Sequence, residues 1–187
     1  VPENGMQEIP DQMVKNLNHD NLLVGKKVIE AKNPERIVLE NNEIIEAKYM
    51  VLTGESNSLV NNHKIEFNSV RTFYFSSRIK VKHSKYINLF PYDNLINNIA
   101  ILSSVSENYS PEGKTLFSIT IIESDLSKSD LIDIIQYKLS TYYGDGKSNY
   151  IFMKEINIKQ ATIKQKKGYF DFKFQDKKNI LFAGDYT

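Results

Sequence analysis

The feature that most constrains this chain is the alternation of apolar and polar side chains in several short runs between residues 69 and 122. The runs cover residues 70–76, 86–90, 96–105 and 115–122. Alternation with a period of two predicts β-strands that bury one face, and a spacing of roughly 10–20 residues is typical of an antiparallel sheet. We therefore expect a sheet-dominated region here.

Residues 127–143 form the clearest predicted helix. Ser127 and Asp130 have the spacing of a capping box, and Gly144 is expected to end the helix. One face carries an apolar stripe, made of Leu131, Ile134, Ile135, Leu139 and Tyr142. A shorter helix is expected within residues 5–17, where Pro10 suits the first turn.

The remaining predicted strands are short apolar or alternating runs, at residues 26–32, 36–40, 43–52, 150–158, 169–174 and 179–183. Asn41 and Asn42 suit a two-residue hairpin turn because asparagine tolerates a positive φ. The apolar run at residues 49–52 is followed by Thr53 and Gly54, which is typical of a buried parallel strand that enters a turn. The sequence therefore predicts an α+β fold with a mixed, mainly antiparallel sheet and flanking helices.

Composition excludes several classes of protein. Hydrophobic residues make up 41% and charged residues 25% of the 187 residues, as in an ordinary globular protein. The net charge of +1 provides no global basic field for nucleic acid or an anionic membrane. No apolar run reaches the roughly 18 residues of a membrane span. The absence of cysteine excludes disulfides and thiol catalysis and fits a reducing, cytoplasmic compartment.

Other motifs give weak signals. Residues 144–148 contain Gly-Lys-Ser, but Thr141 stands where a phosphate-binding loop needs glycine, so a helix-ending turn is favoured. The lysine- and aromatic-rich residues 164–178 are interrupted by acidic residues, which argues against nucleic-acid binding. The histidines do not form a metal-binding pair; they are His19, His63 and His83. No metal site is predicted.

A set of apolar residues is expected to line one or both faces of the predicted sheet: Phe73, Phe75, Phe90, Ile99, Ile101, Phe117, Ile119 and Ile121. They would form either the hydrophobic core or the wall of an apolar ligand pocket. The sequence leaves both interpretations open.

Three separated segments together resemble the FAD-dependent amine oxidase superfamily, which includes protoporphyrinogen oxidases and phytoene desaturases. Residues 5–10 precede a helix and a strand that begins at Val28, residues 43–54 resemble a hairpin with a core strand, and residues 179–187 contain Ala-Gly-Asp after an apolar strand. Residues 109–116, Tyr-Ser-Pro-Glu-Gly-Lys-Thr-Leu, are similar to the superfamily's Tyr-Ala-Pro-x-Gly-Lys-x-Leu.

The resemblance implies FAD as cofactor and a set of contacts to it. Val28 would border the adenine, and Thr53 and Gly54 would lie near the adenosine half. Gly184 would let the backbone approach the cofactor, and the Asp185 carboxylate would bond the ribityl–pyrophosphate region. No catalytic residue is assigned.

The chain departs from the superfamily at its ends, since the Gly-x-Gly-x-x-Gly segment and the helix after Gly-Asp are absent. We therefore expect a fragment that binds FAD weakly or not at all. The resemblance implies pieces of an FAD-binding domain at residues 1–68 and 179–187, and a substrate-binding domain at residues 69–178. Ala161-Thr162-Ile163 stands where the superfamily often has Ala-Leu-Pro, which leaves the substrate pocket undefined.

The implied activity is removal of hydride from an amine or from an apolar polyene or tetrapyrrole-like substrate. The alternative is a non-catalytic α+β module that binds an apolar ligand or a protein partner. An upstream strand followed by Gly-x-Gly-x-x-Gly in the natural gene would favour the enzyme.

Overall fold

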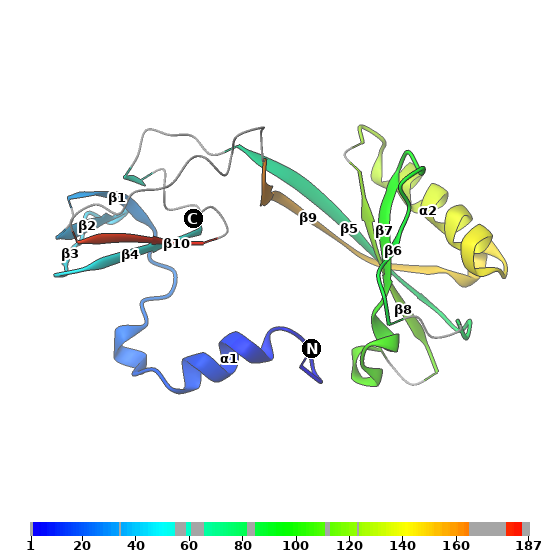
Figure 1. The fold of residues 1–187 in the computed structure, drawn as a ribbon, viewed down its shortest axis with the longest axis horizontal. Coiled ribbons are helices and arrows are strands. Elements are labelled where there is room, and N and C mark those ends of the chain that lie inside the picture. Colours follow the sequence, from blue (N-terminus) through cyan, green and yellow to red (C-terminus); the bar gives the residue numbers. More distant parts are fainter. Residues whose placement is uncertain are drawn as a thin grey trace. The chain divides into compact units, whose positions relative to one another are not determined.

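The computed structural model describes residues 2–33, 35–54, 59–60, 66–81, 85–110, 113–122, 124–164 and 179–184. The chain divides into two compact units (Figure 1). Unit 1 holds Val1–Asn16 and Ser69–Ala161, and unit 2 holds Leu17–Asn68 and Thr162–Thr187. Residues 1–16 therefore group with the large sheet of unit 1. The sequence predicted that they belong to one segment with residues 17–68. The assignment of cofactor and substrate domains stays a prediction.

A five-stranded sheet dominates unit 1, with the strand order β6-β7-β8-β5-β9. Its strands are β5 (Phe67–Ser77), β6 (Asn88–Leu89), β7 (Ile96–Ile101), β8 (Thr115–Ile121) and β9 (Ile151–Ile163). The pairs β6–β7, β7–β8 and β5–β8 are antiparallel, which confirms the predicted sheet type. The expected strand at residues 96–105 ends early, because the chain turns into the 3-10 helix η3 (Leu102–Ser104).

Helix α2 (Lys128–Tyr143) has the predicted bounds and caps. The Ser127 side chain accepts a hydrogen bond from the backbone N–H of Asp130, and Gly144 follows the last turn with a φ of 81°. This positive φ favours glycine. The helix buries Leu131 and Ile135 against the sheet, and Leu139 one turn further on.

The core of unit 1 lies between α2 and one face of the sheet. Its buried side chains form one cluster: Phe73, Phe75, Leu95, Ile96, Ile99, Ile101, Phe117, Ile119, Ile121, Leu131, Ile135, Leu139 and Tyr150. Phe117 makes ring contacts with Tyr143 and Tyr150 at centroid distances of 5.3 and 5.7 Å. Aromatic pairs at this distance add stabilisation beyond the area they bury.

Unit 2 contains an antiparallel sheet of β1 (Val28–Asn33), β2 (Arg36–Leu39) and β3 (Ile44–Glu46). Asn42 has a φ of 65°, as its position in the predicted turn requires. The turn has three residues rather than two, because the N–H of Leu39 bonds the carbonyl of Glu43. A three-residue loop that ends in a left-handed residue is a common hairpin connection.

Unit 2 also contains a parallel pair, β4 (Met50–Thr53) and β10 (Ile180–Ala183). The predicted parallel strand at residues 49–52 is confirmed. The longer strand expected at residues 43–52 is split into β3 and β4. Residues Ala31, Leu52 and Ile180 form the buried cluster shared by the two sheets.

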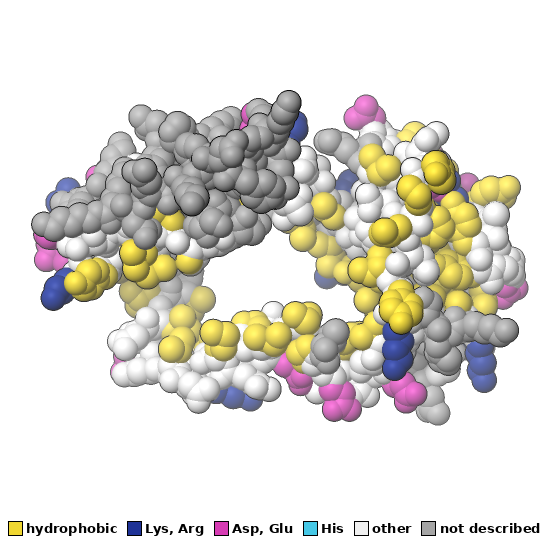
Figure 2. Space-filling view, in the orientation of Figure 1, with side chains coloured by type: hydrophobic (Ala, Val, Ile, Leu, Met, Phe, Trp, Pro, Cys, Tyr) yellow, Lys and Arg dark blue, Asp and Glu magenta, His cyan; other side chains and the backbone are white. Residues whose placement is uncertain are grey.

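Helix α1 (Glu8–Lys15) buries none of its residues. Exposed apolar side chains in and beside the helix are Met6, Ile9, Met13 and Leu17. Figure 2 shows hydrophobic side chains in a line along this segment. No helix within the described ranges is long and apolar enough to cross a membrane. The described residues also form the 3-10 helices η1 (His19–Asn21), η4 (Glu107–Tyr109) and η5 (Lys147–Asn149).

Candidate functional site

The parallel strands bring three of the five residues predicted to bind a cofactor to one edge of a sheet. Ala183 of β10 lies opposite Thr53 of β4, so Gly54 and Gly184 follow at the same carboxyl edge. Ligands of sheets with parallel strands bind beyond the carboxyl ends of the strands. Asp185 comes next in the chain and lies outside the described residues.

Gly54 shows why the turn after β4 needs glycine. Its φ is 59°, in the left-handed region, and no heavy atom lies within 4 Å of the place where a Cβ would stand. The backbone conformation, and not crowding, therefore selects glycine. Among the described residues, nothing beyond its chain neighbours crowds this position.

Val28 occupies a different position. It is the first residue of β1, is half-buried and lies opposite Leu39 in the antiparallel sheet. The two sheets of unit 2 meet through the buried cluster formed by Ala31 of β1 with the parallel pair. Val28 thus belongs to the same unit as Gly54 but not to the carboxyl edge of β4 and β10.

The apolar strand residues belong to the core. Seven of the eight apolar residues that the sequence left open are at most 4% exposed and lie in the cluster beneath α2: Phe73, Phe75, Ile99, Ile101, Phe117, Ile119 and Ile121. Phe90 is partly buried and stacks on Tyr142 with a centroid distance of 4.6 Å. The structure therefore favours the core interpretation over an apolar ligand wall, because α2 fills the space on that face.

The opposite face of the sheet is polar and half-exposed. Alternation places Thr72 and Tyr74 of β5 on this face, next to Thr120 and Ser118 of β8. Ala100 of β7 lies opposite Ser118 and continues the same row. The threonine, tyrosine and serine side chains of this row offer hydroxyl groups that can donate and accept hydrogen bonds.

Asp93 lies in a hydrogen-bonded charge cluster of unit 1. Its carboxylate accepts hydrogen bonds from Lys138 Nζ and the Tyr142 hydroxyl, both at 2.5 Å, and from the backbone N–H groups of Leu95 and Ile96. Burial by itself would raise the pKa of Asp93, but these four donors outweigh it and hold the pKa well below its usual value. Burial and Asp93 together raise the pKa of Tyr142 to about 12. The cluster joins the β6–β7 loop to α2 and is structural.

Of the weaker motifs, the Gly-Lys-Ser segment lies in the described part of the chain. Gly146, Lys147 and Ser148 follow the end of α2, with Lys147 and Ser148 in the 3-10 helix η5, and Lys147 pairs with Asp133. This is the expected helix-ending turn. Residues 165–178 lie outside the described residues, as do His63 and His83. Within the described ranges, no group of three or more His, Cys, Asp or Glu side chains could hold a metal ion.

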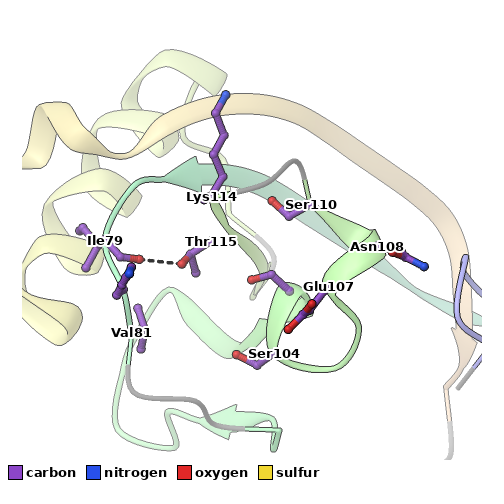
Figure 3. Close-up of a pocket in the computed structure, with 11 residues that line it drawn as sticks. Ile79, Val81, Ser104, Glu107, Asn108, Ser110, Lys114 and Thr115 are labelled. Atoms are coloured by element: carbon purple, nitrogen blue, oxygen red, sulfur yellow. Dashed lines mark hydrogen bonds between the residues drawn. The ribbon is translucent and has the colours of Figure 1, made fainter.

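The structure adds a cavity that the sequence did not predict. It has a volume of about 820 Å³ and lies between the segment after β5, the η3–η4 segment and the loop before β8 (Figure 3). Its lining residues are Ile79, Lys80, Val81, Ser103, Ser104, Glu107, Asn108, Ser110, Gly113, Lys114 and Thr115. Ser110, Gly113, Lys114 and Thr115 belong to the segment 109–116 that carried part of the resemblance.

No protein-family model and no curated protein matches the sequence. Solved structures share its fold. UDP-galactopyranose mutase in its reduced form aligns with a TM-score of 0.67 at 14% identity, over 82% of this chain and 38% of that chain. An oxidoreductase from Methanosarcina mazei aligns with a TM-score of 0.61 at 12% identity, over 87% and 44%. A Pyrococcus furiosus protein aligns with a TM-score of 0.62 at 14% identity, over 86% and 40%.

This chain spans less than half the length of each of these three proteins. At such identities the likeness establishes the fold. It confirms the α+β fold class and shows that part of an oxidoreductase has a similar fold. Membership of the amine oxidase superfamily stays a prediction.

Proposed function

We propose that this chain is part of a flavin-dependent oxidoreductase, in which unit 2 contacts the cofactor and unit 1 provides the substrate-binding sheet. The observation that carries the proposal is the shared carboxyl edge of β4 and β10, where Thr53, Gly54 and Gly184 come together. The fold likeness to an oxidoreductase and to a mutase studied in its reduced form supports it.

The residues at this edge fit a dinucleotide. Gly54 keeps the strand end free of a side chain, so backbone groups are accessible to a phosphate or ribose. Asp185 would add a carboxylate for the ribityl–pyrophosphate region, and Val28 would border the adenine from the neighbouring sheet. When bound, the flavin supplies the hydride acceptor, and the protein positions the substrate and excludes water.

For the substrate we propose an amine rather than a polyene or tetrapyrrole. The apolar strand residues that could have lined a ligand pocket lie beneath α2 instead. The other face of the sheet carries Thr72, Tyr74, Ser118 and Thr120, whose hydroxyls can accept hydrogen bonds from an ammonium or amine group.

The lack of cysteine further suggests a reducing, cytoplasmic setting.

The test uses the natural gene product that contains this sequence. We expect the purified protein to show visible flavin absorbance and its reading frame to encode a strand followed by Gly-x-Gly-x-x-Gly. Gly54→Val should reduce flavin content strongly. Gly25→Val is the matched control, because Gly25 also has a positive φ, 72°, and open space where a Cβ would lie.

A colourless product that takes up no FAD overturns the proposal and leaves the non-catalytic binding module. Equal flavin loss in the Gly54 and Gly25 variants would show a folding defect and remove the assignment of the β4–β10 edge.

A further inference from the structure

The cavity of unit 1 is built from three chain segments that two hydrogen bonds hold together. The Thr115 hydroxyl donates to the carbonyl oxygen of Ile79 at 2.6 Å, which joins the segment after β5 to the start of β8 (Figure 3). The Ser103 hydroxyl oxygen accepts from the N–H of Leu116 at 3.1 Å, which joins η3 to β8. These two bonds hold the described parts of the three segments together.

Two hydroxyl groups of the cavity can form further hydrogen bonds to a ligand. Ser110 Oγ is buried, with less than 1 Å² exposed, and has no hydrogen-bond partner in the described part of the chain. A buried polar atom without a partner is costly, so a group that bonds it is favoured. The Ser103 hydroxyl accepts one bond and retains a proton to donate.

The charges of the cavity favour an anion over a neutral ligand. Lys80 and Lys114 line it, and neither forms an ion pair within the described residues. Among the described lining residues, Glu107 is the acidic one. Figure 3 shows Lys114 extending away from Ser104 and Glu107, whereas Lys80 also lines the cavity and is exposed. The side-chain amide of Asn108 already donates a hydrogen bond to Glu3 Oε1 at 3.1 Å.

We propose that this cavity binds a phosphate group, with Lys80 as its counter-ion and the Ser103 and Ser110 hydroxyls as donors. A tetrahedral oxyanion accepts several hydrogen bonds at once, and an ammonium group binds it as a point charge. The volume of about 820 Å³ also accommodates a phosphorylated metabolite of nucleotide size. The site lies in unit 1.

The test is an NMR chemical-shift titration of the whole chain with inorganic phosphate, glycerol 3-phosphate and neutral glycerol. We expect saturable shifts at residues 79–81, 103–110 and 113–115 with both phosphates and none with glycerol. Tighter binding of glycerol 3-phosphate would identify a phosphate ester as the ligand, and equal binding would identify free phosphate.

Four variants test which side chains of the cavity contact the phosphate. Lys80→Gln should weaken phosphate binding about tenfold, because a charge-assisted hydrogen bond is lost. Ser110→Ala should weaken it about threefold or more without lowering the melting temperature, since the free chain loses only an unpaired hydroxyl. Glu107→Gln should tighten it about threefold at low salt by removing a like charge. Lys154→Gln, at an exposed position of β9, is the matched control and should change nothing.

Shifts that do not saturate, or that are equally affected by Lys80→Gln and Lys154→Gln, would show non-specific binding of an anion and overturn the proposal. Binding that is unchanged in both Ser110→Ala and Glu107→Gln would also overturn it, because the phosphate would then lie outside the cavity.

Discussion

The two units of this chain differ in how their sheets are stabilised. In unit 1, α2 covers one face of a five-stranded sheet, and aromatic and branched side chains fill the space between them. In unit 2, the buried cluster among the described residues consists of Ala31, Leu52 and Ile180. Burial of apolar area is the main source of stability, so unit 1 should be the more stable unit.

The exposed apolar side chains on the parallel strands of unit 2 also indicate that unit 2 is the less stable unit. Val51 and Leu181 are paired neighbours in the parallel pair, yet they are 58% and 44% exposed. Parallel strands are normally covered on both faces. The unit with the predicted cofactor edge therefore has the smaller described core, and regions with small cores open locally more readily.

The largest expected effect concerns the core of unit 1. Phe117→Ala should lower the free energy of unfolding by about 3–5 kcal/mol, because it removes a fully buried ring, whereas Leu52→Ala in unit 2 should cost only about 2 kcal/mol. Residue-resolved hydrogen exchange in urea measures both. A larger loss of unfolding free energy for Leu52→Ala than for Phe117→Ala would contradict the expectation that unit 1 is the more stable unit. Tyr92→Ala serves as the control, because this side chain is 97% exposed.

The next effect concerns the Asp93 cluster. Asp93→Ala should destabilise unit 1 by about 1.5–3 kcal/mol, because Lys138 and Tyr142 lose a charged partner in a place with little water. Urea unfolding monitored by circular dichroism measures the change. A loss below about 0.5 kcal/mol, the size of an ordinary surface substitution, would show that the cluster contributes little.

The same carboxylate predicts a pH dependence. The pKa of Asp93 is lowered in the folded chain, so its stabilising contribution is complete above the unfolded value near 3.9 and is lost as pH falls towards the folded value. The urea midpoint should therefore fall between pH 5 and pH 2 by more in the natural chain than in Asp93→Asn. Parallel curves for the two proteins would contradict the assignment.

The smallest effect concerns the predicted cofactor edge. Gly54→Ala should destabilise unit 2 by about 1–2 kcal/mol, since a φ of 59° is strained for a residue with a Cβ. Exchange rates of the β4 and β10 amides should rise, while those of β5, β7 and β8 should not. Unchanged β4 and β10 rates would show that the turn adapts without strain.

The local pattern of the sequence determined the elements whose signals lie within a few residues of each other. Ser127, Asp130 and Gly144 defined α2, because capping needs only neighbouring groups. Alternation along β8 located that strand for the same reason. The hairpin at Asn42 was located, but its length was wrong by one residue, because loop length depends on which pair of residues closes the hairpin.

Tertiary structure alone decided which distant residues meet. It paired β10 with β4 in parallel, about 130 residues apart in the chain, and so placed Gly184 beside Gly54. It placed the apolar strand residues beneath α2, which turned a candidate ligand wall into core. It also closed a cavity from Ile79, Ser103 and Ser110, none of which has a local signal for binding. Periodicity specifies which side chains share a face, but the partner of that face depends on packing between segments far apart in sequence.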